Sequence, residues 1–156
     1  MPTTTSSTDR IEKQITLDAP RSRVWRALTE VNQFNSWFGV SLATPFAPGA
    51  EVSGQISIRG YEQVRMTIWI ETMDAPRFFS FRWHPYAIEP GVDYSAEPTT
   101  LVTFTLEDAG AGTRLTIVES GFDAIPESRR AKAFSMNAAG WNGQAENIRK
   151  FLAAQP

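Results

Sequence analysis

The sequence has no cysteine among its 156 residues and a single histidine, His84. Without cysteine, the chain can form no disulfide bond, thiolate nucleophile or cysteine metal site. A metal motif needs several ligands at short spacing, and His84 has no second histidine or cysteine to join it. The glycine-rich dinucleotide fingerprint and the Gly-x-Ser-x-Gly elbow are also missing. We therefore expect no bound metal and no cofactor.

An excess of one charge and long apolar runs are also lacking. The net charge is −2, so no basic field favours nucleic acid. No apolar run is long enough to span a membrane, and the Thr/Ser-rich start, Met1 to Thr8, lacks the apolar segment of a secretory signal. A cytoplasmic location is the default expectation. The length suits one domain, which we place at residues 10–156 after a flexible tail at residues 1–9.

Large aromatic side chains are abundant, with five tryptophans and ten phenylalanines. Three of them fall in a long C-terminal segment, Pro126 to Leu152, whose apolar residues recur every three or four positions. This spacing predicts one helix with a buried stripe around Trp141. Gly140 and Gly143 flank Trp141, and glycine destabilises a helix interior by about 1 kcal/mol relative to alanine. We therefore expect another backbone to approach the helix closely there.

The rest of the chain predicts strands and two short helices. Apolar side chains at period two indicate strands, and three- and four-residue spacing indicates helices. The expected strands are residues 11–17, 51–58, 64–71, 78–83, 99–107 and 113–120, and the expected helices are residues 21–31 and 32–37. Consecutive strands with short turns pair as an antiparallel meander. A sheet and a helix that each have one apolar face predict an α+β two-layer domain.

Ordered motifs along nearly the whole chain resemble the START-like, or SRPBCC, superfamily. More narrowly, they resemble the branch related to the C-terminal domain of the ATPase activator of the ninety-kilodalton heat-shock chaperone (AHSA-type). The matching segments are Ala19-Pro20 with residues 24–29, Trp37-Phe38-Gly39, residues 79–83, residues 101–106, residues 112–116, Glu119-Ser120-Gly121-Phe122 and Gly140-Trp141. The resemblance implies a helix-grip fold, in which a curved antiparallel sheet wraps around a long C-terminal helix. It carries over no catalytic motif.

Glu119 is the most suggestive polar residue. It follows Leu115 and Ile117 at period two, so strict alternation directs its carboxylate inward beneath the helix. A desolvated carboxylate there could act as an acid, a base or a ligand anchor. The alternative is that the strand ends by Val118 and that Glu119 turns to solvent or pairs with an arginine.

His84 is the second candidate for proton transfer. It closes the strand that ends at Trp83, beside a proline-rich segment, where it could titrate at the rim of a binding site. A solvated or hydrogen-bonded histidine at a strand end is the simpler interpretation.

A ligand between sheet and helix would contact mostly aromatic side chains, since natural binding cavities are largely apolar with few polar anchors. The same rings could equally fill a core. The side-chain amides of Asn137 and Gln144 could equally cap backbone groups. The candidate ligand-binding residues are Trp37, Phe38, Phe46, Met66, Trp83, Phe104, Glu119, Phe122, Phe134, Asn137, Trp141 and Gln144.

Residues 85–98 form a long break between strands, with three prolines and two tyrosines. Loops of this length are usually functional or disordered. We call this segment the insert, and it is a candidate lid or dimer contact.

Three functions follow from these observations and the resemblance. We favour a non-enzymatic protein that binds a small hydrophobic or aromatic molecule between the curved sheet and the C-terminal helix. One alternative, implied by relatives, is a polyketide cyclase or hydrolase that uses Glu119 or His84. The other is a stress-response module that contacts a chaperone. A homodimer through a sheet edge or the insert is a further expectation.

Overall fold

The computed structural model describes residues 9–89 and 91–154. The expected tail at residues 1–9 therefore lies outside the described residues except for Asp9. The backbone carbonyl of Asp9 accepts hydrogen bonds from the amides of Gly121 and Phe122, at 3.1 and 3.2 Å. Asp9 thus holds the start of the first strand beside the end of the last one.

Seven antiparallel strands form one open sheet in the order β1-β7-β6-β5-β4-β3-β2. From β3 to β7, neighbours in the sheet are neighbours in the sequence, which is the predicted meander. The strands are β1 (Arg10–Leu17), β2 (Val40–Leu42), β3 (Glu51–Ile56), β4 (Arg65–Asp74), β5 (Phe78–Trp83), β6 (Thr100–Ala109) and β7 (Gly112–Ser120).

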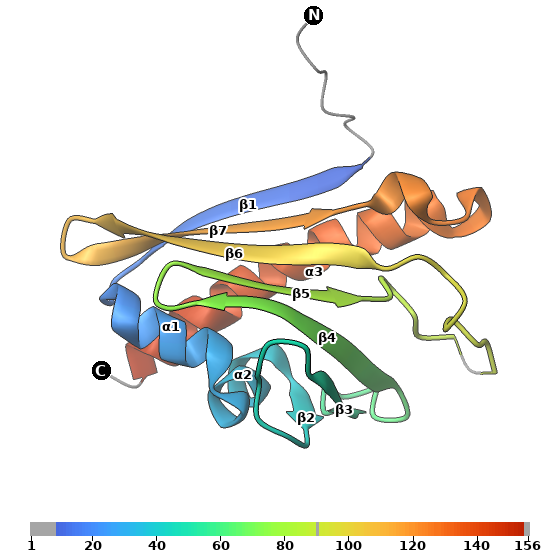
Figure 1. Ribbon diagram of the computed structural model, residues 1–156, viewed down its shortest axis with the longest axis horizontal. Helices are drawn as coiled ribbons and strands as arrows, with labels where there is room; N and C mark the ends of the chain where they lie inside the picture. The colour runs from blue at the N-terminus through green and yellow to red at the C-terminus, as the bar shows by residue number, and fades with distance from the viewer. Residues whose placement is uncertain (1–8, 90, 155–156) are drawn as a thin grey trace, which may run out of the picture.

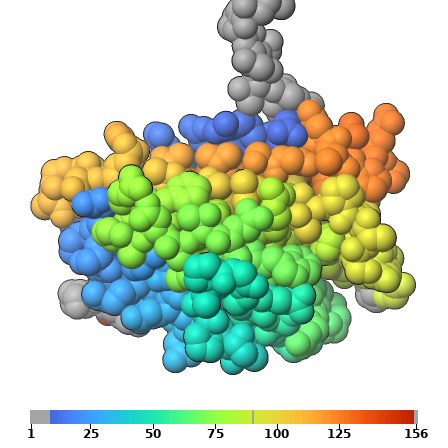
Figure 2. Space-filling view, in the orientation of Figure 1, coloured from blue at the N-terminus to red at the C-terminus, as the bar shows by residue number. Residues whose placement is uncertain are grey.

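The helices cover one face of this sheet. α1 (Arg21–Thr29) and α2 (Val31–Phe38) follow β1, and a single turn, η1 (Phe122–Ala124), leads into α3 (Glu127–Ala154). α3 crosses diagonally behind the strands (Figure 1), and in Figure 2 nearly all of its red C-terminal part is hidden. The predicted α+β helix-grip fold is confirmed. In the described ranges, no helix combines the length and the apolar character needed to cross a membrane.

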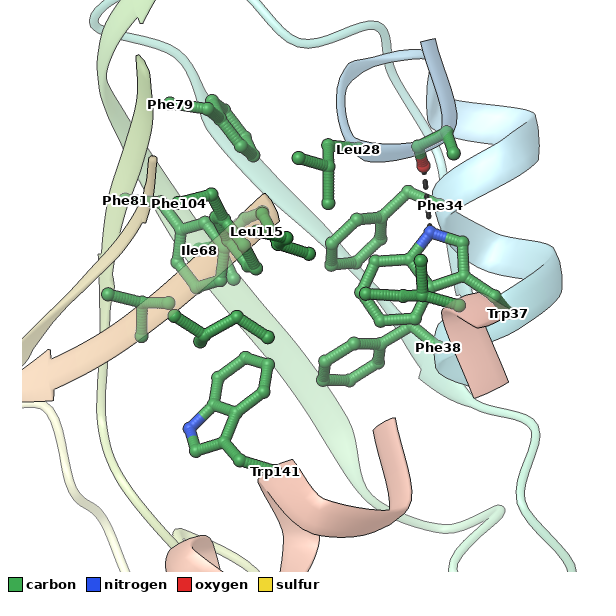
Figure 3. Close-up of a cluster of buried hydrophobic side chains, with 14 of the residues drawn as sticks. Leu28, Phe34, Trp37, Phe38, Ile68, Phe79, Phe81, Phe104, Leu115 and Trp141 are labelled. Atoms are coloured by element: carbon green, nitrogen blue, oxygen red, sulfur yellow. Dashed lines mark hydrogen bonds between the residues drawn. The ribbon is translucent and has the colours of Figure 1, made fainter. Parts of the chain in front are cut away.

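The space between sheet and helices is filled mainly by aromatic rings. Phe34 of α2 packs 4.9 Å from the Trp37 ring and 6.3 Å from the Phe81 ring, centroid to centroid. Figure 3 shows these rings converging with Phe79, Phe104 and Trp141 from the sheet and from α3. Each such pair adds about 0.5–1.5 kcal/mol beyond the area that it buries.

Strand β2 has no counterpart among the expected elements. It pairs with β3, and the Asn35 side-chain amide bonds to both the N–H and the carbonyl of Leu42, at 2.9 and 3.1 Å. Gly54 in β3 permits the close approach, because a Cβ atom there would lie 2.0 Å from the Ser41 carbonyl oxygen. Three residues are too few to show a period in the sequence.

The expected backbone approach beside Trp141 is wrong. A Cβ atom added at Gly140 or Gly143 would meet nothing within 4 Å, and both residues are exposed. Trp141 itself is buried on the opposite side of α3. The two glycines therefore lie on the solvent face of the helix and have no packing role among the described residues.

Candidate functional site

The Glu119 side chain is fully buried, at 0% exposure. In β7, buried and more exposed residues alternate from Thr113 to Ser120, and this alternation directs Glu119 to the helix-covered face. On the neighbouring strand Glu119 is paired with Val102, and on the other side with Ile11. The carboxylate therefore lies inside the molecule, and the alternative of a solvent-facing Glu119 is wrong.

Four neutral side chains donate hydrogen bonds to this carboxylate. The Trp83 indole and the Thr100 hydroxyl donate to Oε2, at 2.8 and 2.6 Å. The Trp141 indole donates to Oε1 at 2.8 Å, and Asn137 Nδ2 lies 3.0 Å from both oxygens. Trp83 comes from β5, Thr100 from β6 and the other two from α3. Glu119 thus links the sheet to the helix through neutral donors and not through the expected alternative of an arginine.

Burial raises the pKa of Glu119 above its usual value, and the four hydrogen bonds partly offset this effect. Desolvation penalises the charged form, whereas donors to the carboxylate favour it. Since no cation pairs with Glu119 among the described contacts, the neutral donors alone stabilise its charge. Hydrogen bonds to charged groups contribute about 1.5–3 kcal/mol each.

A cavity of about 810 Å³ opens in front of this network. Its lining comes from β4 and the residues just before it, from parts of β3, and from the insert. Phe38, Trp83 and Asn137 complete the lining, and we call these three the floor because Trp83 and Asn137 bond to Glu119 and the Trp83 ring packs 5.9 Å from the Phe38 ring. The lining residues are Phe38, Glu51, Ile56, Gln63, Val64, Arg65, Met66, Thr67, Trp69, Trp83, His84, Tyr86, Ala87, Ile88, Glu89, Gly91, Val92, Asp93, Tyr94, Ser95 and Asn137.

Four of the candidate ligand-binding residues border this cavity. They are Phe38, Met66, Trp83 and Asn137. Trp83 and Asn137 are also hydrogen-bonded to Glu119, so Glu119 lies directly behind the floor without lining it. The cavity is thus displaced toward β3, β4 and the insert, and α3 contributes Asn137 to it.

The remaining aromatic candidates lie in the packed interior and do not line the cavity. Trp141 stacks on Trp83, with ring centroids 5.7 Å apart, and meets Phe104 edge-on at 5.9 Å. This close packing is the reason that the rings fill a core instead of enclosing a void. The candidates placed in this way are Trp37, Phe46, Phe104, Phe122 and Trp141, which are buried, and Phe134, which is half-buried against Phe122.

Gln144 takes the backbone-capping role that was the alternative to ligand contact. Its Nε2 donates to the Phe38 carbonyl at 2.9 Å, at the end of α2. Gly39, with φ of 90°, terminates α2 at this point. Gln144 therefore fixes α3 against α2 and supports Phe38 in the cavity floor.

His84 borders the cavity at the junction of β5 and the insert. Its ring is perpendicular to the Trp69 ring at 5.5 Å, and its Nδ1 atom is buried without a hydrogen-bond partner among the described residues. Burial is the main cause that lowers the pKa of His84. The imidazole is therefore neutral at pH 7.

Arg129 anchors the insert, a role that the sequence did not reveal. Its guanidinium forms a bidentate pair with Glu97, with Nη2 2.8 Å from Oε1, and donates to the carbonyls of Pro85 and Tyr86 at 2.9 and 3.1 Å. The guanidinium also lies 4.8 Å from the Tyr94 ring centroid. The position of Arg129 in the helical pattern gives no sign of a partner 32 residues away.

The comparisons with known proteins identify the family. The family model described as "Activator of Hsp90 ATPase homolog 1-like protein" matches residues 18–153. The chain belongs to this family. The resemblance found in the sequence motifs is thereby confirmed. No curated protein matches the chain.

Solved structures share the fold of the family. Protein MLL2253 from Mesorhizobium loti is 23% identical, with a TM-score of 0.74 over 94% of this chain and 98% of that one. A protein from Arthrobacter aurescens is 20% identical, with a TM-score of 0.77 over 94% and 87%. DynU16, from the dynemicin biosynthetic locus, is 23% identical, with a TM-score of 0.71 over 93% of this chain and 47% of its own. These identities establish the fold and no activity.

Proposed function

We propose that the protein binds a small hydrophobic or aromatic molecule in the cavity between β4 and the insert. The observation that carries the proposal is the cavity itself. Its volume of about 810 Å³ lies within the range of about 300–1,000 Å³ that is typical of ligand sites. Its floor and walls include the rings of Phe38, Trp69 and Trp83.

The floor of the cavity is held in place before any ligand arrives. Trp83 is fixed by its hydrogen bond to Glu119 and by stacking on Trp141, and Asn137 is fixed by the same carboxylate. Side chains that are already ordered lose little entropy on binding. The Glu119 network therefore supports the proposal even though Glu119 does not line the cavity.

Burial of apolar surface would supply the affinity. A two-ring aromatic molecule buries up to about 250 Å², which contributes about 6 kcal/mol at 25 cal/mol per Å². Loss of translational and rotational freedom costs about 4 kcal/mol or more. Contact with two of the cavity's aromatic rings adds about 0.5–1.5 kcal/mol per pair. The net of about 3–5 kcal/mol predicts millimolar dissociation constants for simple aromatic probes.

Titration with naphthalene tests the proposal. The chain has five tryptophans, so a ¹⁵N-labelled sample gives five indole N–H signals. We expect naphthalene to shift the indole N–H signals of Trp69 and Trp83 saturably. The indole N–H signal of Trp37 should not change, because this group donates to the Ala27 carbonyl and Trp37 does not line the cavity. No saturable shift would overturn the proposal.

A pair of methionine variants supplies the control. Met66→Trp places a large ring in the cavity and should weaken naphthalene binding at least about tenfold. Met136→Trp adds the same ring at an exposed site of α3 outside the cavity, and binding should not change. Equal binding by both variants would contradict the assigned site.

An enzymatic role would have to use His84 and not Glu119. Both oxygens of Glu119 are occupied by donors and sealed from the cavity, whereas the His84 ring borders it. A general base must reach the proton that it abstracts.

Chaperone contact and a homodimer stay predictions. A pull-down experiment would test the first, and analytical sedimentation would test the second.

One solved structure of this fold, DynU16, is described as a putative protein in the dynemicin biosynthetic locus. A shared fold does not establish a shared function, so the naphthalene titration is the deciding test.

A further inference from the structure

The orientation of one amide gives the cavity floor a defined hydrogen-bonding polarity. Asn137 lines the cavity, and its Nδ2 lies 3.0 Å from both oxygens of Glu119. The same oxygens also accept from Trp83, Thr100 and Trp141. A carboxylate that receives all these bonds is an acceptor, so it can be faced only by the NH₂ end of the amide. The flipped amide would bring two acceptors together.

The oxygen of the Asn137 amide consequently points away from Glu119. Nδ2 and Oδ1 are the two ends of one planar group, and Asn137 is one of the residues that line the cavity. No donor among the described residues bonds to Asn137 Oδ1. Among these residues, His84 Nδ1 is the only side-chain polar atom that is both buried and unpartnered, so Asn137 Oδ1 must be accessible to water. The cavity floor therefore presents an open acceptor beside the Trp83 ring.

Charge in the cavity has one predominant sign. Among the described residues the lining includes the carboxylates of Glu51, Glu89 and Asp93, and the guanidinium of Arg65. Glu119 lies immediately behind the floor without a cationic partner. A negatively charged ligand would be repelled by the three lining carboxylates and by Glu119, and among the lining residues only Arg65 would oppose this repulsion.

On the basis of the proposed function, we infer that the ligand is an aromatic molecule that carries a hydroxyl or N–H donor and no negative charge. The donor of this ligand binds Asn137 Oδ1. Glu119 acts as a positioning residue, because it fixes which end of the amide faces the ligand. Fatty acids and other carboxylates are disfavoured by the excess of carboxylates over cations in the lining. The aromatic ring lies against Trp83 and Phe38, and the donor lies at the Asn137 end of the floor.

A matched probe series tests this inference separately from the proposed function. Naphthalene has no polar group, 2-naphthol adds a donor, 2-methoxynaphthalene keeps the oxygen without the donor, and 2-naphthoate adds a negative charge. We expect 2-naphthol to bind about tenfold more tightly than its methyl ether, as one hydrogen bond to an accessible acceptor allows. We expect 2-naphthoate to bind at least about tenfold more weakly than 2-naphthol.

Variants on α3 assign the donor preference to one residue. Asn137→Leu removes the acceptor and preserves side-chain size, so 2-naphthol and its methyl ether should bind within about twofold of each other. Asn142→Leu is the matched control, since Asn142 is an exposed amide on the same helix outside the cavity. This control should keep the full preference of the unchanged protein.

The outcomes separate the two proposals. Saturable binding of naphthalene with equal affinity for 2-naphthol and its ether would overturn the inference and leave the proposed function standing. A preference that survives in Asn137→Leu would also overturn it, because another acceptor would then be responsible. Binding of 2-naphthoate as tightly as 2-naphthol would overturn the exclusion of anions. If naphthalene itself does not bind, the proposed function and the inference fall together.

Discussion

Trp83 and Trp141 stack with their ring centroids 5.7 Å apart and 29° between their planes, and each donates its indole N–H to a different oxygen of Glu119. One indole comes from the sheet and the other from α3. The carboxylate therefore holds together two aromatic rings that belong to different layers of the fold. This relationship gives the first two predictions.

Replacing Glu119 with glutamine should destabilise the protein by about 1–3 kcal/mol. The glutamine NH₂ group cannot accept a hydrogen bond, so one indole N–H loses its acceptor, and a buried unpaired donor costs about that amount. Urea unfolding measures the change. Glu107→Gln is the control, since Glu107 is exposed and 3.5 Å from Arg114, and it should change stability by less than about 0.5 kcal/mol. Equal effects of the two substitutions would contradict a structural role for the Glu119 network.

The stability deficit of Glu119→Gln should grow as the pH falls. Burial raises the pKa of Glu119 in the folded state above its unfolded value of about 4.5. Between these two values the folded state binds more protons than the unfolded state, so this group stabilises the fold increasingly as the pH falls to about 4.5. The glutamine variant has no such contribution, and other titrating groups cancel in the difference. A difference that is constant from pH 7.5 to pH 4.5 would contradict the raised pKa.

Arg129→Met should loosen the insert while the core stays intact. The substitution leaves Glu97 without its partner and removes the bonds to the carbonyls of Pro85 and Tyr86. Tyr86 has a φ of 49°, an unfavourable conformation for a residue with a Cβ atom, so it needs such support. Loss of one partner from a largely buried ion pair is costly. Hydrogen exchange at residues 85–98 should therefore accelerate about tenfold or more.

The control for Arg129→Met is Arg149→Met on the same helix. Arg149 is exposed and pairs with Glu146 one turn away, so exchange in the insert should not change. If the amides of β6 and β7 also exchange faster in Arg129→Met, the insert is not an independently opening unit, and the prediction fails.

Gly140→Ala and Gly143→Ala should each stabilise the protein by up to about 1 kcal/mol. Both glycines lie in the interior of α3 with open space where a Cβ atom would be, and alanine is the better helix former. Gly54→Ala is the opposite case, because its Cβ atom would lie 2.0 Å from the Ser41 carbonyl oxygen and should displace β2. Thermal unfolding of the three variants measures these opposite signs. A fall in melting temperature for both helix variants would contradict the open space around them.

Periodic features of the sequence predicted most of the architecture. The spacing of apolar residues around Trp141 gave the long helix, and the alternation through Leu115 and Ile117 placed Glu119 on the covered face. These predictions succeed because each depends on one element and its own period. The motif order then predicted how the elements assemble, and the family match confirms it.

The features that the sequence did not predict depend on contacts between distant segments. Arg129 meets Glu97 across 32 residues, and Thr100 completes the Glu119 network from another strand. The cavity walls come from β3, β4 and the insert, which the sequence shows only as separate segments. The relative positions of these segments are set by the curvature of the sheet and by the docking of the insert. Neither of these produces a periodic pattern in the sequence.

The attachment of the insert to the first turns of α3 has a kinetic consequence. Glu97, Pro85 and Tyr86 are held by one guanidinium near the start of a helix whose later turns carry the core. Helix ends open at far lower free energy than a whole domain. The insert should therefore open when that first turn frays, at a rate that is insensitive to substitutions that shift the global unfolding midpoint.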